Sequence, residues 1–201
     1  ENMKRHLAMM REAKEKHVSI VTFPELSLTG YTCGDLFFQR RLLDDVTDAL
    51  LALKDEMPEG ILAVVGAPLE IEGALYNCAV VLHKGEIISA VPKTFLPNNG
   101  EFYEKRWFQS GDARRDASVA IPKLKTDVCR QAIFETEDGV RFGIELCEDL
   151  WAPLPPSTML SVEGAEIILN LSASNELLSK REYRQQLISQ QSARCQCGYV
   201  Y

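Results

Sequence analysis

The sequence is short of positive charge. Lys and Arg total 22 against 29 Asp and Glu, which gives a formal net charge of −7. An acidic surface repels phosphate backbones and anionic lipids, so nucleic acid and membrane surfaces are disfavoured as main partners. No apolar run reaches the roughly 20 residues of a membrane-spanning helix, and the charged N-terminus ENMKRHLAMM is unlike a secretory signal. We therefore expect a cytoplasmic protein that binds neither nucleic acid nor membrane.

Histidines and metal-binding motifs are also scarce. Only His6, His17 and His83 are present; none is placed for a Cys–His dyad, and there is no HExxH motif. The six cysteines are Cys33, Cys78, Cys129, Cys147, Cys195 and Cys197. Their spacing does not fit a zinc site, and a chain of 201 residues, 46% of them hydrophobic, needs no disulfide framework. We predict reduced thiols, with no metal or cofactor bound by this chain.

What is present is the pattern of one α/β domain. Helical periodicity covers residues 2–16, 40–56 and 179–195, and one further helical turn is expected within the loop 97–112. Buried strands are expected at 17–23, at 61–69 and within 161–174, with hairpins at 74–93 and 128–147 that turn at Lys84-Gly85 and Asp138-Gly139. Helices that alternate with buried strands and hairpins predict a layered α/β sandwich with a mixed sheet.

Three strand ends each carry a reactive side chain. Glu25 stands in TFPELSLTGY, Lys93 in AVPKTFLPNNGEFYEKRWF and Cys147 in GIELCEDLW. Taken singly, each has an ordinary interpretation: a carboxylate near a helix start, a solvated lysine and a small buried thiol. Together they supply a base, a cation and a nucleophile at equivalent strand ends, where catalytic groups gather. A buried Glu or Lys would also need a partner.

The acidic flank of Cys147 bears on how such a thiol could be activated. Glu145, Glu148 and Asp149 surround it in the sequence. Negative neighbours raise the pKa of a thiol and make the thiolate scarce. Since no histidine is placed to help, a carboxylate is the expected general base.

The three segments FPELSLTGY, PKTFLPNNGEFYEKRWF and GIELCEDLW resemble, in this order, the signature segments of the nitrilase superfamily. The resemblance covers nearly the whole chain. It implies a Glu-Lys-Cys triad on a four-layer αββα sandwich. LCEDLW, PKTFLPN…EFYEKRWF and the late NLSAS are closer to one branch, whose domains hydrolyse glutamine to supply ammonia for NAD⁺ synthesis.

This resemblance implies a role for each of eight residues. Glu25 corresponds to the general base, Lys93 to the triad lysine, Cys147 to the nucleophile and Glu104 to a second glutamate that supports the lysine. The positions that correspond to contacts with the substrate, L-glutamine, are Asn99, Glu148, Ser174 and Lys180. Asn99 departs from the family pattern, because many members have tyrosine there.

The same resemblance implies a larger parent enzyme. Its ammonia would pass to a C-terminal NAD⁺ synthetase domain that uses ATP and Mg²⁺ to amidate nicotinic acid adenine dinucleotide. Residues 1–201 contain no SGGxDS-type phosphate loop, so we expect them to form the glutaminase domain alone. We also expect strands before Glu1 and after Tyr201. Without them the sheets have exposed edges, so the isolated piece would have little or no activity.

Members of this superfamily usually associate, so we expect a homo-oligomer. Two alternative functions stay open. The first is a free-standing amidase or carbamoylase of the same superfamily. The second is a non-catalytic scaffold or binding module with a degenerate site. Ammonia release from glutamine, compared with simple amides and carbamoyl amines, separates these possibilities.

Overall fold

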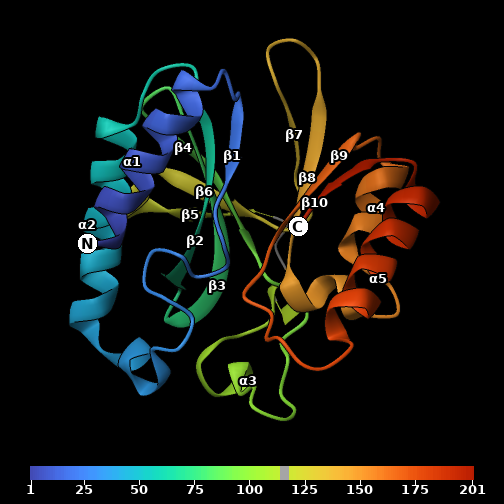
Figure 1. Ribbon diagram of the computed structural model, residues 1–201. Helices are drawn as coiled ribbons and strands as arrows, with labels where there is room; N and C mark the ends of the chain where they lie inside the picture. The colour runs from blue at the N-terminus through green and yellow to red at the C-terminus, as the bar shows by residue number, and fades with distance from the viewer. Residues whose placement is uncertain (114–117) are drawn as a thin grey trace.

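Two β-sheets pack face to face between two layers of helices in the computed structural model, which describes residues 1–113 and 118–201 (Figure 1). Helices α1 (Asn2–Glu15) and α2 (Arg40–Glu56) cover the outer face of the first sheet. Helices α4 (Pro156–Val162) and α5 (Lys180–Cys195) cover the outer face of the second. This arrangement confirms the predicted αββα sandwich.

The first sheet has six strands in the order β1-β2-β3-β4-β6-β5. They are β1 (Ile20–Thr22), β2 (Leu62–Ile71), β3 (Ala74–His83), β4 (Glu86–Pro92), β5 (Ser118–Ile121) and β6 (Thr126–Cys129). β1 runs parallel to β2 and β4 parallel to β6, whereas the other pairs are antiparallel. Lys84 and Gly85 both have positive φ at the predicted β3–β4 turn, as a two-residue hairpin requires.

The second sheet has four strands in the order β10-β9-β8-β7. They are β7 (Ile133–Glu135), β8 (Arg141–Leu146), β9 (Ile167–Leu171) and β10 (Gly198–Val200). β8, β9 and β10 are parallel, and β7 forms an antiparallel hairpin with β8. Short helical turns complete the chain: η1 (Gly34–Phe38), α3 (Glu104–Trp107), η2 (Gly111–Ala113), η3 (Pro122–Leu124) and η4 (Cys147–Trp151).

Strand periodicity divides the core into an outer and an inner layer. On β2, Ala63 and Val65 pack toward α1 and α2, while Val64 packs toward the second sheet. On β8, Ile144 and Leu146 lie in the layer between the sheets. Because both faces of each sheet are covered, the buried strands read as continuous apolar runs.

Two sequence predictions were wrong in detail. The strand expected at 17–23 is limited to β1, which is half-buried because it lies at a sheet edge. The hairpin expected over 128–147 begins only at Ile133, because Val128 belongs to β6 in the other sheet. Apolar patterning identifies a strand but not the sheet that receives it. Within the described ranges, no helix has the length and apolar character needed to cross a bilayer.

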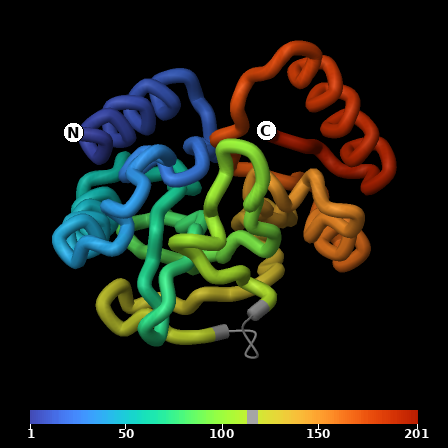
Figure 2. The backbone as a smooth tube through the Cα atoms, turned by 90° about the horizontal axis from the view of Figure 1, so that it is seen from below, coloured from blue at the N-terminus to red at the C-terminus, as the bar shows by residue number. Residues whose placement is uncertain are grey.

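The loops after β1, β4 and β9 lie together at one end of the sandwich. They occupy the lower end in Figure 1, and Figure 2 looks at them from below. Hydrogen bonds join them: Lys93 of the second loop and Ala173 of the third both donate to Glu25 of the first. The first two loops carry Glu25 and Lys93, and Cys147 follows β8, whose last residue pairs with the last residue of β9.

Candidate active site

Glu25 is fixed by a close approach of two backbones. The amides of Phe23 and Leu28, on either side of it, donate to carbonyls of β2 at 2.9 and 3.1 Å. The β2 residue beneath this turn is Gly66, where a Cβ atom would lie 2.3 Å from the amide nitrogen of Leu26. Only glycine permits this contact. The Glu25 side chain is therefore held in the interior, 2% exposed.

Lys93 follows β4 and is completely buried, 0% exposed. Its Nζ donates to Glu25 Oε1 at 2.6 Å and to Glu104 Oε1 at 2.7 Å. Asn77, from β3, donates to Glu25 Oε1 at 2.7 Å, and Tyr31 donates to Glu104 Oε1 at 2.7 Å. One buried ammonium group is thus shared by two buried carboxylates, and this satisfies the requirement for paired charges.

The electrostatics of this cluster keep Lys93 charged. Burial alone would lower the pKa of Lys93, but the carboxylates of Glu25 and Glu104 outweigh it and raise the pKa. Burial raises the pKa of Glu104, against the opposing effect of Lys93. An ammonium has three N–H donors. Two of them reach carboxylates, and the third has no hydrogen-bond partner among residues 1–113 and 118–201.

Cys147 begins η4 directly after β8, with a φ of +44°. A positive φ is strained for a residue with a side chain, and such strain clusters at functional sites. Its amide donates to Asn170 Oδ1 at 2.9 Å, and this bond fixes the turn. The turn presents Sγ to the third loop, where Ser172 Oγ lies 3.4 Å away. Cys147 is 7% exposed, and Glu148 and Ser172 beside it are half-buried.

The thiol of Cys147 is protonated at rest. Burial and the Glu25 carboxylate raise its pKa to about 12, although Lys93 opposes them. The amide of Ala173 donates to Glu25 Oε2 at 3.1 Å and also lowers the pKa of Cys147 by hydrogen bonding. The thiol and the Glu25 carboxylate therefore share one backbone donor. Such a thiol reacts only when a neighbouring base removes its proton.

Two of the predicted substrate contacts form a pair of opposite charges next to this cluster. Burial raises the pKa of Glu148, and the charges of Lys93 and Lys180 oppose this. Lys180 Nζ lies 5.3 Å from the ring centroid of Trp151 and 5.8 Å from that of Phe102, both within cation–π range. A carboxylate and an aromatic-held ammonium complement the two charged ends of an α-amino acid.

The other two predicted contacts differ in position. The amide of Ser174 donates to Ser172 Oγ at 3.2 Å, and Ser172 Oγ in turn contacts the thiol of Cys147. Ser174 is therefore linked to the thiol through Ser172. Asn99 is exposed, and its carbonyl accepts the amide of Phe102 at 3.0 Å. The structure thus brings seven of the eight predicted residues into one region and leaves Asn99 at the surface.

Several residues of the site carry signals that the sequence analysis passed over. Asn77 is a single amide within the apolar run ALYNCAVVLH, and Asn170 is one within IILNL. A polar group inside a buried strand needs a partner. Asp149, next but one to Cys147, is fully buried and accepts the amides of Thr94, Phe95 and Leu146 at 3.1, 2.7 and 2.9 Å. It therefore ties the loop after Lys93 to the turn of Cys147.

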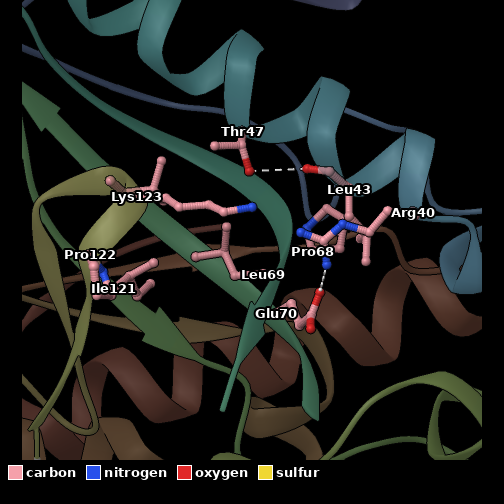
Figure 3. A pocket seen from close by; sticks show the side chains of 10 residues that line it. Arg40, Leu43, Thr47, Pro68, Leu69, Glu70, Ile121, Pro122 and Lys123 are labelled. Carbon is pink, nitrogen blue, oxygen red and sulfur yellow. Dashed lines mark hydrogen bonds and ion pairs between the residues drawn. The ribbon is translucent and has the colours of Figure 1, made fainter. Parts of the chain in front are cut away.

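A separate cavity of about 330 Å³ lies between α2 and the first sheet, away from the cluster (Figure 3). Two charged side chains of its lining, Arg40 and Glu70, pair with each other at 2.5 Å, and Arg40 also contacts Asp44, which lies outside the lining, at 3.1 Å. No residue of the Glu25–Lys93–Cys147 cluster lines it. Across residues 1–113 and 118–201, no group of three or more His, Cys, Asp or Glu side chains could hold a metal ion. None of the six cysteines, all in described segments, forms a disulfide.

An αββα sandwich with a Glu-Lys-Cys cluster at the ends of its strands is a nitrilase-type hydrolase fold. The chain belongs to the carbon-nitrogen hydrolase family, which it matches over residues 1–201. The resemblance drawn from the three signature segments is thereby confirmed.

Similar proteins narrow the family to one branch. The chain is 38% identical over 198 residues to the glutamine-dependent NAD(+) synthetase of Mycobacterium tuberculosis (strain ATCC 25618 / H37Rv), covering 97% of this chain and 29% of that protein. A glutamine-dependent NAD(+) synthetase from Cytophaga hutchinsonii superposes with a TM-score of 0.86 at 30% identity, over 98% of this chain and 32% of that one. An amidase from Nesterenkonia sp. shares the fold, with a TM-score of 0.76 at 17% identity over 99% and 68% of the two chains. The chain thus spans under a third of the length of the curated relatives it matches.

Proposed function

We propose that this chain is the glutaminase part of a glutamine-dependent NAD⁺ synthetase and cleaves the side-chain amide of L-glutamine. The observation that carries the proposal is the buried Lys93 ammonium, shared by Glu25 and Glu104 beside the Cys147 thiol. Base, cation and nucleophile lie together in a buried site, an arrangement suited to covalent amide hydrolysis.

Acylation begins with proton transfer from Cys147 to Glu25. The sulfur attacks the amide carbon and forms the S–C bond, and the carbonyl oxygen becomes an oxyanion. The free N–H of Lys93 and the backbone amide after the nucleophile stabilise that charge. The C–N bond then breaks, and the departing nitrogen takes the proton from Glu25 and leaves as ammonia. The product is a glutamyl thioester.

Deacylation reverses these roles with water as the nucleophile. Glu25 takes a proton from water, whose oxygen attacks the thioester carbon. The second tetrahedral intermediate collapses by breaking the S–C bond, which expels the Cys147 sulfur. The sulfur recovers the proton from Glu25, and glutamate leaves. One water is consumed and one ammonia released. Glu104 supports this cycle by holding Lys93 in place at 2.7 Å.

Glutamine specificity is assigned to the charged pair at the entrance. The Glu148 carboxylate suits the α-ammonium group of the substrate, and Lys180 suits its α-carboxylate. Ser174, one contact from the thiol, would meet the same end of the substrate. Asn99 stays part of the proposed substrate set as a surface residue of the loop after Lys93.

The part of the relatives that this chain does not cover is proposed to consume the ammonia. We propose that a C-terminal synthetase domain binds ATP and Mg²⁺ and transfers the ammonia to deamido-NAD⁺. The glutaminase domain itself needs no cofactor in this scheme, because Glu25, Lys93 and Cys147 supply every proton and charge. We also retain the expectation of a homo-oligomer, which light scattering of the full-length protein measures directly.

Release of ammonia from glutamine by the full-length protein tests the proposal. Cys147→Ala and Glu25→Gln should each abolish release, since one removes the nucleophile and the other the base. Wild-type turnover should favour glutamine over simple amides and carbamoyl amines. Equal turnover of simple amides would instead support the free-standing amidase. Undiminished turnover by Cys147→Ala would refute the catalytic proposal altogether.

A further inference from the structure

The nucleophilic sulfur has a neighbour that the proposed mechanism does not use. Ser172 follows β9, and its Oγ lies 3.4 Å from Cys147 Sγ, within hydrogen-bonding distance for sulfur. The same oxygen lies 2.8 Å from the hydroxyl of Tyr201 and 3.2 Å from the amide nitrogen of Ser174. A serine hydroxyl has one hydrogen to donate and two lone pairs that accept. The amide nitrogen of Ser174 can only donate to it, and Ser172 is itself the donor toward sulfur.

Two neighbours hold the oxygen of Ser172 in place. The amide of Ser174 can only donate, and it takes one lone pair of Ser172. The phenol oxygen of Tyr201 lies 2.8 Å away on another side and also has hydrogen bonds with the side chains of Trp151 and Ser174. The Ser172 oxygen is thus fixed between Ser174 and Tyr201, 3.4 Å from the sulfur.

In its contact with sulfur, Ser172 is the donor. We propose that the Ser172 hydroxyl is a further catalytic group of this site, which donates a hydrogen bond to Cys147 Sγ as negative charge develops there, and that Ser174 and Tyr201 hold its oxygen in place. This inference rests on the proposed function for its chemistry, since it names a donor for the same nucleophile. Its geometry is independent of which amide is the substrate.

The hydroxyl acts at two points of the reaction. It stabilises sulfur as Glu25 removes the thiol proton, and again when the second tetrahedral intermediate expels sulfur as a leaving group. Lys93 serves a different atom, the substrate oxygen. A hydrogen bond to a charged group is stronger than one to a neutral group. Ser172 therefore stabilises the charged sulfur more than the resting thiol, which is the condition for an effect on rate.

Two measurements on the full-length protein test this assignment. Ser172→Ala should lower kcat for glutamine about tenfold to a hundredfold, somewhat less than the loss of an oxyanion donor, with KM changed less than about twofold. The rate at which iodoacetamide alkylates Cys147 at about pH 8, followed by peptide mass, should fall about tenfold, because a rise of about one unit in the pKa of the thiol lowers the thiolate fraction tenfold. Ser172→Thr, which keeps the hydroxyl, should restore most of both values.

Two further variants complete the comparison. Tyr201→Phe removes the phenol oxygen that lies 2.8 Å from Ser172 but leaves the Ser172 hydroxyl, so its alkylation rate should change by less than that of Ser172→Ala. Ser161→Ala is the matched control, because the Ser161 hydroxyl bonds only to a carbonyl of its own helix in the described structure. It should match the wild type in both measurements.

The alkylation assay separates this inference from the proposed function, because it needs no substrate. An unchanged alkylation rate in Ser172→Ala overturns the role of Ser172, even if kcat falls together with thermal stability. If Ser172→Ala is not recovered folded, Ser172→Gly replaces it, and a wild-type alkylation rate in that variant overturns the role instead. Undiminished glutamine hydrolysis by Cys147→Ala would refute the proposed function. The alkylation result would then still show the effect of Ser172 on the thiol of Cys147, without a role in catalysis.

Discussion

The two sheets bury their carboxylates in different ways. Glu25 and Glu104, on loops that follow strands of the first sheet, share the ammonium of Lys93. Glu145 lies on β8 of the second sheet and Asp149 on η4, which follows β8. Neither forms an ion pair within the described part of the chain. They are satisfied by backbone amides and neutral side chains. In the proposed mechanism the charged cluster exchanges protons with the substrate, whereas Glu145 and Asp149 hold the backbone in place.

The Glu145 network shows how neutral donors serve the nucleophile. Glu145 accepts the amide of Ser157 at 2.7 Å, the hydroxyl of Tyr199 and the amide group of Asn170 at 3.4 Å. Asn170 in turn accepts the amide of Cys147 at 2.9 Å. Glu145 therefore orients Asn170, and Asn170 fixes the strained turn of Cys147.

Removing the shared cation should produce the largest effect. Lys93→Met leaves two buried carboxylates without their counter-charge, which costs about 3–5 kcal/mol of stability. It also removes the donor to the oxyanion, so kcat should fall by about 10³ or more. Urea unfolding and ammonia release measure the two losses. Lys84→Met is the matched control, since its ion pair with Glu137 is exposed. Retention of more than a tenth of wild-type kcat by Lys93→Met would contradict the role of this ammonium.

Removing the Asp149 carboxylate, which is held by backbone amides, should lower the free energy of unfolding as its main effect and kcat as a secondary effect. Asp149→Ala orphans the buried amides of Thr94, Phe95 and Leu146, and each unpaired group costs about 1–3 kcal/mol before relaxation. We expect a net loss of about 2–4 kcal/mol in urea unfolding. kcat should fall too, because the loop after Lys93 is then untied from the turn of Cys147. Asp127→Asn, exposed on β6, is the control, and equal stability of the two variants would contradict this assignment.

The sequence predicted the helices and strand-end residues well, because each of those features is local. Glu25, Lys93 and Cys147 each follow a recognisable apolar run, and the predicted helix 40–56 is α2 to the residue. What joins them is not local. Asp149 lies beside Cys147 in sequence yet bonds to amides more than 50 residues away, at Thr94 and Phe95. Periodicity places a residue on a face but does not say which loop of the other sheet will meet it.

The hairpin error over 128–147 has the same origin. Val128 pairs with Ala90 of β4 rather than with the β7–β8 hairpin. Its apolar pattern fits either sheet equally well. The sequence did not indicate the contact between Ser172 and Tyr201 for a related reason. The two residues are 29 positions apart and follow the ends of the parallel strands β9 and β10. Only the assembled second sheet shows that they meet.

A smaller effect should appear in the pH dependence of stability. Burial raises the pKa of Glu145 above its ordinary value of 4.5, so the folded protein binds this proton more tightly than the unfolded chain does. Its contribution to stability is full below 4.5 and is lost as pH rises through the folded pKa. Glu145→Gln cannot titrate. The unfolding free energy of the wild type should therefore fall relative to this variant as pH rises above 4.5. Glu86→Gln, exposed on β4, controls for the loss of one charge, and parallel curves for wild type and Glu145→Gln would contradict the assignment.

The smallest effect should come from an exposed ion pair that lies outside both the Lys93 cluster and the Glu145 and Asp149 networks. Arg40 and Glu70 meet at 2.5 Å beside the cavity of Figure 3, but their side chains are 58% and 39% exposed. Water and salt screen such a pair, and its formation costs side-chain entropy. Arg40→Ala should change the unfolding free energy by less than about 0.5 kcal/mol and leave kcat unchanged. A loss above about 1 kcal/mol would mean that contact geometry, rather than burial, sets the strength of charge pairs in this protein.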